Sequence, residues 1–202
     1  MKSVISIGRQ FGCGGREICN RLARELNIPF YDRELIEYAA AKSGIRPEIL
    51  AQYDENATTS LLYSLSISAY SYAGPAMNTP NLPRYDQLFI SQSEVIRQLA
   101  DKGPCIILGR CSDYVLRDRD DVLKVFIHCD LETRTANIEK RLGLPKSKAA
   151  ELIKKTEKRR ASYYNYYTHR KWGELSNFDL AINSASGIDK VVETIKNFYN
   201  AE

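Results

Sequence analysis

The sequence predicts a three-layer α/β fold around a five-stranded parallel sheet. Five short runs predicted as strands alternate, for the most part, with longer segments in which apolar residues recur at helical spacing. A glycine-rich loop directly follows the first run and leads into the first helical segment, an order typical of parallel α/β proteins that bind phosphate. With 202 residues, 44% of them hydrophobic, the chain is long enough for one domain over residues 1–202.

The glycine-rich loop is the feature on which the functional prediction depends. Val4, Ile5 and Ile7 predict a short buried strand before it, and apolar residues from Ile18 onward predict a helix after it. A loop with few Cβ atoms turns its backbone N–H groups toward one point, and the helix behind it adds the dipole of its N-terminus. Such a nest binds phosphate. Its glycines are Gly8, Gly12, Gly14 and Gly15.

The loop departs from the usual phosphate-binding pattern GxxxxGK[ST]. Aligned with that pattern, Arg9 stands at the first glycine, Gly15 at the lysine and Arg16 at the hydroxyl residue. Because one helix terminus contributes only about 0.3–1 kcal/mol toward an exposed anion, a polyphosphate also needs cations. We expect Arg9 and Arg16 to supply them, with Arg16 in the role of the lysine. The alternative is a glycine-rich turn between strand and helix that binds nothing.

A second strand is predicted over residues 28–32, followed by a helix that begins near Arg33. Asp32 and Arg33 stand at the carboxyl end of this strand, where open α/β sheets place ligand contacts. The alternative is an N-cap followed by an exposed first-turn residue. Residues 46–85 are longer than a simple crossover requires. An excursion over a binding cleft, an oligomer contact and an insertion without a role are the three alternatives for them.

The middle of the chain predicts a helix over residues 87–102 and then a central strand in PCIILG, residues 104–109. Arg110 and Asp113 follow this strand closely. A cation and a carboxylate together at the end of a buried strand indicate a ligand site. An ion pair on the surface is the alternative.

Two more strands and a last helix complete the predicted fold. The strands are expected at Val122–His128 and Phe178–Asn183. Ser186 and Asp189 indicate a capping box that opens the last helix, and the apolar stripe of that helix extends to Phe198.

Two strongly charged helices are predicted between these strands, over residues 131–143 and 145–168. The second mixes cations with tyrosines in RRASYYNYYTHRKW, a combination also found on surfaces that stack nucleic-acid bases. Acidic residues between the cations and a net charge of only +4 argue against nucleic acid, so we expect the tyrosines to pack on the core. His128 and His169 are assigned packing or surface roles rather than metal ligation.

Cysteine usage and hydropathy restrict the class of protein. The five cysteines are an odd number without a CxxC pair, which predicts reduced thiols rather than a disulfide framework or a zinc site. No apolar run approaches the ~18 residues of a membrane span, and Lys2 leads straight into a strand where a signal peptide would stand. We therefore expect a cytoplasmic protein with no membrane partner, whose mild positive charge suits an anionic small molecule.

Several motifs together resemble the cytidylate kinase-like family of nucleoside monophosphate kinases. They are the loop GRQFGCGGREI, the segments FYDRELI and GPCIILGRCSDYVL, the charged helix that ends in YYNYYT, and NFDLAIN. The resemblance covers nearly the whole chain and implies a P-loop kinase fold with a small acceptor-binding excursion at about residues 33–86 and a helical lid at about residues 141–172. It also implies transfer of a phosphoryl group from ATP to a nucleoside monophosphate, with Mg²⁺ held through the nucleotide and no protein residue assigned as its ligand.

The resemblance also assigns roles to individual residues. The donor base is expected near Asn183, and the acceptor nucleotide at Asp32, Arg33 and Arg110, with Asp113 close by. The lid contributes Glu157 to the acceptor site and Arg141 and Arg160 to catalysis, together with Arg16 of the loop. The donor polyphosphate is expected at Gly12, Cys13, Gly14, Gly15, Arg16 and Glu17, with Arg9 beside them.

The chain departs from the family pattern at several positions. Leu108 and Cys111 replace two aspartates, and the loop lacks its lysine and its hydroxyl residue. Two alternatives to a nucleoside monophosphate kinase therefore stay open: a nucleotide-binding regulatory protein without transfer activity, and a kinase of another small metabolite. The sequence predicts neither the identity of the acceptor nor the oligomeric state.

Overall fold

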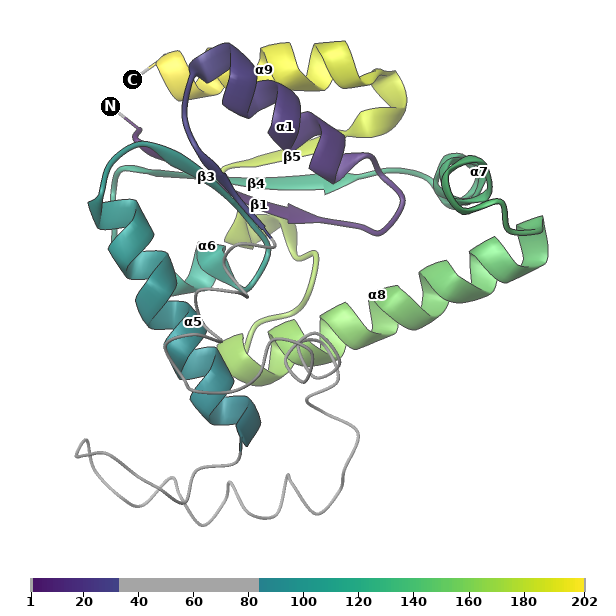
Figure 1. Ribbon diagram of the computed structural model, residues 1–202, viewed down its shortest axis with the longest axis horizontal. Helices are drawn as coiled ribbons and strands as arrows, with labels where there is room; N and C mark the ends of the chain where they lie inside the picture. The colour runs from purple at the N-terminus through teal and green to yellow at the C-terminus, as the bar shows by residue number, and fades with distance from the viewer. Residues whose placement is uncertain (1, 33–83, 202) are drawn as a thin grey trace.

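Five parallel strands form a sheet at the centre of the protein, in the order β2-β3-β1-β4-β5 (Figure 1). The computed structural model describes residues 2–32 and 84–201. All neighbouring strands are parallel, which confirms the predicted fold class. The strands are β1 (Val4–Arg9), β2 (Phe30–Tyr31), β3 (Cys105–Leu108), β4 (Val122–His128) and β5 (Leu180–Asn183).

The position of β1 explains why buried residues follow one another in it without exposed residues between them. It pairs with β3 through Ile5 and Ile106, and with β4 through Ile7 and Val125. Helices cover both faces of the sheet, so the side chains on either face of β1 are buried. Because parallel strands all end at the same edge, the residues directly after β1, β2 and β3 lie along that edge.

Helices form the outer layers of the fold. One face of the sheet carries α1 and α9, and the other carries α5 and α6 (Figure 1). Ile18 of α1 and Ile195 of α9 are fully buried against the first face, and Ile96 of α5 is fully buried against the second. The helices are α1 (Gly15–Leu26), α5 (Arg84–Asp101), α6 (Ser112–Val115) and α9 (Ile188–Asn200).

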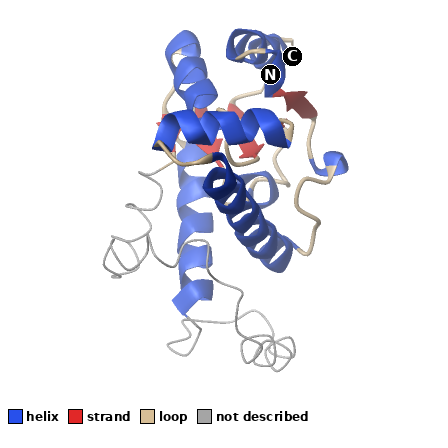
Figure 2. Cartoon of the chain, turned by 90° about the vertical axis from the view of Figure 1, so that its right-hand side faces the viewer, coloured by secondary structure: helices blue, strands red, loops and turns tan. Residues whose placement is uncertain are grey.

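Two further helices, α7 (Leu131–Leu142) and α8 (Lys146–Thr168), lie beyond the carboxyl ends of the strands. Figure 2 shows α7 across the end of the sheet and α8 below it. Gly143 ends α7 with a φ of 65°, and Pro145 precedes α8, so the predicted separation of the two helices is confirmed.

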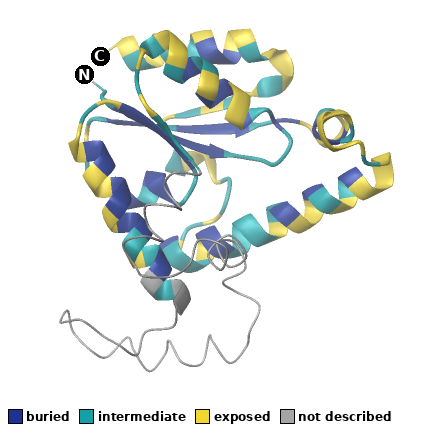
Figure 3. Cartoon of the chain, viewed as in Figure 1, coloured by how far each residue is buried: buried dark blue, intermediate teal, exposed yellow. Residues whose placement is uncertain are grey.

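The tyrosines of α8 pack on the core, as predicted. Tyr163 and Tyr164 are buried, and Tyr167 stacks on Phe89 of α5 with ring centroids 4.1 Å apart. Figure 3 shows buried residues along α8 on the side that faces the sheet. These rings fix the far end of α8 while its first half extends past the end of the sheet.

Both edge strands are shorter than predicted. The N–H of Ile28 donates to the carbonyl of Ala23 and so closes the end of α1, and Pro29 has no N–H, so β2 begins only at Phe30. The N–H of Phe178 likewise donates to the carbonyl of Leu175 in a 3₁₀ turn, and β5 begins two residues later. In each case a local turn uses the backbone donor that a strand would need.

Two details of the last helix are corrected. The predicted capping box is absent from α9, because Ser186 Oγ donates to the carbonyl of Asn183 and Asp189 pairs with Arg21 of α1. Gly187, with a φ of 103°, precedes the helix instead. Phe198 is 48% exposed and lies outside the buried stripe.

Other expectations concern the chain as a whole. The five cysteines are buried and form no disulfide with one another. Across residues 2–32 and 84–201, the structure contains no helix with the length and apolar character needed to cross a bilayer. The helix predicted from Arg33 and nearly all of the excursion predicted at residues 33–86 lie outside the described residues.

Candidate functional site

The loop between β1 and α1 has the backbone of a phosphate nest. Gly12 and Gly14 have φ angles of 89° and 77°, which side chains with a Cβ atom rarely adopt. A Cβ atom on Gly12 would also lie 2.9 Å from the carbonyl oxygen of Arg134. Gly14 is the N-cap of α1 and has no side chain with which to cap the helix, so the N-terminal end of α1, with its dipole, faces the loop.

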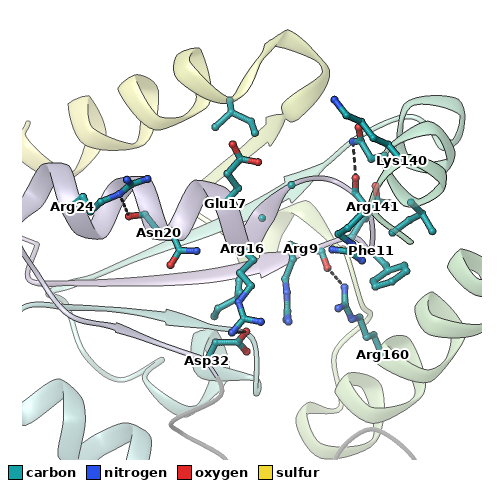
Figure 4. Close-up of a pocket in the computed structure, with 18 residues that line it drawn as sticks. Arg9, Phe11, Arg16, Glu17, Asn20, Arg24, Asp32, Lys140, Arg141 and Arg160 are labelled. Carbon is teal, nitrogen blue, oxygen red and sulfur yellow. Dashed lines mark hydrogen bonds and ion pairs between the residues drawn. The ribbon is translucent and has the colours of Figure 1, made fainter. Parts of the chain in front are cut away.

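A cavity of about 780 Å³ opens in front of this loop (Figure 4). It is bounded by the loop, by α1, by the ends of β2 and β3, and by α7 and α8. Basic side chains outnumber acidic ones in its lining, which suits a polyanion. The basic residues are Arg9, Arg16, Arg24, Lys140, Arg141 and Arg160, and the acidic ones are Glu17 and Asp32.

Two arginines that flank the loop, one at the end of β1 and one in the first turn of α1, point to the same side of the cavity (Figure 4). The stem of Arg9 lies over Gly15, since a Cβ atom there would be 3.0 Å from Arg9 Cγ, and the guanidinium reaches Gly109 at the end of β3. Arg16 is 60% exposed, and its Nη2 lies 3.6 Å from Asp32 Oδ2. Glu17 points away from both toward the other side of the cavity. The structure thus brings Arg9, Arg16 and Asp32 together.

Helix α8 is docked on the loop. Glu157 Oε1 accepts the backbone N–H of Phe11 at 2.6 Å, and Arg160 Nη1 donates to the carbonyl of Arg9 at 3.1 Å. The guanidiniums of Arg141 and Arg160 lie 5.2 and 5.5 Å from the centre of the Phe11 ring, within cation–π range. These contacts bring the three predicted lid residues, Arg141, Glu157 and Arg160, to the loop. Glu157 is hydrogen-bonded to the backbone of the loop.

Helix α7 contributes two residues that the sequence analysis missed. Asn137 Nδ2 donates to the carbonyl of Gly12 at 2.8 Å. Arg134 is only 9% exposed, its Cβ lies beside Gly12, and its Nε and Nη1 have no hydrogen-bond partner among the described residues. A buried guanidinium costs free energy unless an anion pairs with it. The sequence carried no signal for either residue, because both belong to a helix rich in charged and polar side chains.

Cys13 of the loop faces the core rather than the cavity. Its side chain is buried with Ile18 and Leu22, and burial raises the pKa of its thiol. Of the predicted donor-binding residues, Cys13 therefore offers only its backbone to a ligand.

A second, smaller hollow lies beside the large cavity, at the turn after β3. Gly109, Arg110 and Cys111 have φ angles of 79°, 59° and 55°, a run of left-handed residues of the kind that clusters at functional sites. Arg110 and Asp113 line this hollow, and Arg9 and Arg160 line both it and the large cavity.

Asp113 is buried, with 4% of its surface exposed, so it is not half of a surface ion pair. Its Oδ2 accepts the hydroxyl of Tyr164 at 2.6 Å. Burial raises the pKa of the Asp113 carboxyl, and the hydrogen bond from Tyr164 opposes part of that rise. Asp113 thereby ties α6 to α8 directly behind Arg110.

Two predicted residues are not brought into this arrangement. The side chain of Asn183, at the end of β5, accepts the N–H of Ala185 and is outside the described lining of both cavities. Arg33 lies outside the described residues.

The carboxylates near the loop are paired with other groups of the protein. Within residues 2–32 and 84–201 no group of three or more His, Cys, Asp or Glu side chains is placed to hold a metal ion. The loop carries Arg16 where a hydroxyl residue usually binds magnesium. The neighbouring carboxylates Asp32 and Glu157 are engaged by Arg16 and by the N–H of Phe11.

The sequence matches the model of the Cytidylate kinase-like family over residues 4–186. The chain belongs to this family. A curated cytidylate kinase from Sulfurisphaera tokodaii is 29% identical over 113 residues, which are 54% of this chain and 62% of that protein. The match thus spans less than two thirds of that relative's length.

Solved structures resemble the chain along almost its full length. An uncharacterized protein from Eubacterium ventriosum is 27% identical, with a TM-score of 0.75 over 100% of both chains. Shikimate kinase from Bacteroides thetaiotaomicron is 12% identical, with a TM-score of 0.55 over 96% of this chain and 97% of that one. A gluconokinase from Sinorhizobium meliloti is 15% identical, with a TM-score of 0.51 over 96% and 90%. The fold is that of the P-loop kinases.

Proposed function

We propose that the protein is an ATP-dependent phosphotransferase that moves the terminal phosphoryl group of ATP to a phosphate oxygen of a nucleoside monophosphate. The observation that carries this proposal is an arginine-lined cavity at the glycine nest with a smaller hollow beside it at the turn after β3, and Arg9 and Arg160 line both. A donor and an acceptor that both carry phosphate need two anion sites that face each other. Family membership over residues 4–186 supports the same reaction class.

The proposed donor site is the loop from Gly12 to Glu17. Its backbone N–H groups and the N-terminus of α1 bind the polyphosphate. Arg9 and Arg16 stand beside it, and Arg134 lies next to Gly12 with two guanidinium nitrogens that have no partner among the described residues. In this proposal the nucleotide base extends toward Asn183.

The proposed acceptor site lies at the ends of β2 and β3. Arg110 and Arg33 bind the acceptor phosphate, Asp32 binds the acceptor nucleotide, and Asp113 holds α6 and α8 behind it through Tyr164. Guanidinium groups suit this role because their planar fork binds two phosphate oxygens at once.

Transfer forms a bond between an acceptor phosphate oxygen and the γ-phosphorus of ATP and breaks the bond between that phosphorus and the β–γ bridging oxygen, releasing ADP. An ionised acceptor phosphate needs no general base, so the protein's contribution is alignment and neutralisation of charge. Arg141 and Arg160 supply positive charge from α7 and α8, and docking of α8 through Glu157 excludes water. Magnesium is carried by the phosphates of the nucleotide.

A coupled assay with ATP and each nucleoside monophosphate tests this proposal. Arg110→Ala and Arg160→Ala are each expected to lower kcat/KM by roughly 10²–10³, by analogy with the loss of one charge-stabilising donor. The matched control is Lys148→Ala, which lies on α8 with Arg160 but is exposed and paired with Glu151. Wild-type turnover in both arginine variants would overturn their assigned roles.

One observation favours a second candidate, a nucleotide-binding regulatory protein without transfer. Gly15 stands at the lysine position, and Leu108 and Cys111 replace two aspartates of the family pattern. Both candidates bind nucleotide, but only the kinase forms ADP when an acceptor is supplied. If nucleotide stabilises the protein but no ADP forms with any acceptor of the panel, the protein is either a regulatory protein or a kinase of another small metabolite. A wider panel of hydroxylated acceptors then distinguishes these two candidates.

A further inference from the structure

Two positions of the loop have exchanged residue types. The usual pattern carries glycine at its first position and lysine six residues later. Here Arg9 occupies the first position and Gly15 occupies the lysine position. The sequence shows that the loop has lost a cation at one end and gained one at the other, but not whether the two positions meet in space.

The structure shows that they do meet. A Cβ atom on Gly15 would lie 3.0 Å from Arg9 Cγ and 3.2 Å from Arg9 Cβ, which is tighter than ordinary van der Waals contact. The stem of Arg9 therefore occupies the space into which a side chain at position 15 would extend. Glycine at position 15 makes room for the arginine, and the arginine covers the glycine.

The guanidinium of Arg9 lies between the two proposed anion sites. A Cβ atom on Gly109 would overlap Arg9 Nη1, so the guanidinium reaches the backbone at the end of β3. Arg9 lines both the large cavity and the hollow at Arg110. Its backbone carbonyl accepts a hydrogen bond from Arg160, so the docked α8 holds the residue in place.

Arg16 is less well placed for the same task. It is 60% exposed, and its guanidinium lies 3.6 Å from Asp32, whose carboxylate offsets its charge. The side chain of Arg9, by contrast, passes Gly15 and Gly109 and has no carboxylate in salt-bridge contact among the described residues.

We propose that Arg9, rather than Arg16, is the cation that replaces the lysine of the phosphate loop, delivered from the end of β1 over Gly15 instead of from the start of α1. This inference rests on the proposed phosphotransfer function. In it the fork of Arg9 contacts oxygens of the transferred phosphoryl group, because its stem is packed over Gly15 and its tip lies beside Gly109.

An exchange of the two residues tests the inference in the full-length protein. Arg9→Ala and Arg9→Gly are each expected to lower kcat by roughly 10²–10³, and Arg9→Lys by less. The double variant Arg9→Gly with Gly15→Lys restores the usual layout, and we expect it to recover at least about tenfold over Arg9→Gly. Gly15 has no positive φ, so a lysine fits its backbone once Arg9 is gone. Gly15→Lys alone places two stems in one space and is expected to lose activity.

The controls separate this inference from the proposed function. Arg21→Ala, on the exposed side of α1 and paired with Asp189, is the matched surface variant. Arg16→Ala is expected to lose less kcat than Arg9→Ala. If Arg9→Ala keeps kcat within about threefold of wild type, or Arg16→Ala loses more, the inference is overturned while the proposed function stands.

If the wild-type protein transfers no phosphoryl group, the proposed function is wrong. The role of Arg9 in phosphate binding is then tested by the affinity for ADP, measured by calorimetry. Loss of at least about tenfold in Arg9→Ala, with recovery in the double variant, supports the inference, and equal affinities overturn it. Circular dichroism of each variant identifies any that fails to fold. In that case the comparison of Arg9→Lys with wild type is decisive. If kcat and the affinity for ADP are both unchanged in Arg9→Lys, the inference is overturned.

Discussion

The two ends of the sheet use charge in opposite ways. At the amino ends of the strands, Arg119 donates to both oxygens of Asp121 at 2.9 Å and also contacts Asp101. The hydroxyl of Ser3, just before β1, bonds the same Asp121 carboxylate. Every charge in this cluster has an opposite charge beside it. At the carboxyl ends, six basic side chains and two acidic ones line one cavity.

This difference separates stability from binding. Matched charges at the amino ends tie the start of β1 to the start of β4 and add to stability without attracting an anion. An excess of one sign in a cavity costs stability through repulsion and is offset only when an anion of opposite charge binds. The comparison therefore predicts that ligands and salt act on one end of the sheet and pH acts on the other.

Nucleotide binding should give the largest effect. At about 100 times its dissociation constant, ADP is expected to add about 2.7 kcal/mol to the free energy of unfolding, a rise of roughly 5–10 °C in Tm for a domain of this size. The shift should shrink in 1 M salt, where the screening length is about 3 Å. Differential scanning fluorimetry with and without ADP measures it. Adenosine, which lacks phosphate, is the control, and an equal shift with adenosine would contradict the role of the cations.

Truncation of Glu157 tests the contact between α8 and the loop. Glu157→Ala removes the acceptor of the Phe11 N–H, and a hydrogen bond to a charged group contributes about 1.5 kcal/mol or more. We expect a loss of about 1.5 kcal/mol in the free energy of unfolding, measured by urea denaturation.

Glu151→Ala on the same helix is the matched control. Its carboxylate is 71% exposed and contacts only the exposed Lys148 among the described partners, so its loss should stay within about 0.5 kcal/mol. Equal losses in the two variants would show that α8 gains nothing from its contact with the loop.

The sequence predicts the centre of the fold better than its edges. Val122–His128 is β4 with both bounds as predicted, because five of its seven residues are apolar and buried, as in a strand covered on both faces. The edge strands β2 and β5 were predicted too long, because their ends depend on which carbonyl accepts the N–H of Ile28 or Phe178. Hydropathy carries no information about that choice.

The same limit applies to the site. The glycine loop and the turn at Arg110 could be identified because their residue types follow directly on a strand. The contact of Arg9 with Gly15 and Gly109, the bond between Glu157 and Phe11, and the burial of Arg134 could not, because each depends on segments brought together only by folding. Glu157 and Phe11 are 146 residues apart.

The amino-end cluster gives the smallest effect and the clearest pH dependence. The two hydrogen bonds from Arg119 hold the pKa of the Asp121 carboxyl below its usual value of about 3.9. The folded protein therefore favours the ionised form, and the stability this provides is present above about pH 4 and lost as pH falls through the folded-state pKa. Because both side chains are about one-third exposed, Asp121→Asn should cost only about 1 kcal/mol at pH 7.

The difference in unfolding free energy between Asp121→Asn and wild type should then decrease below about pH 4, as measured by urea denaturation from pH 7 to pH 2. Asp118→Asn, whose carboxylate is exposed beside Arg117, is the control and should show little difference at any pH. A difference that stays constant down to pH 2 would mean that Asp121 stabilises β1 and β4 through its shape and neutral hydrogen bonds. The ion pair between Asp121 and Arg119 would then not account for the difference between the amino end of the sheet and the end that binds anions.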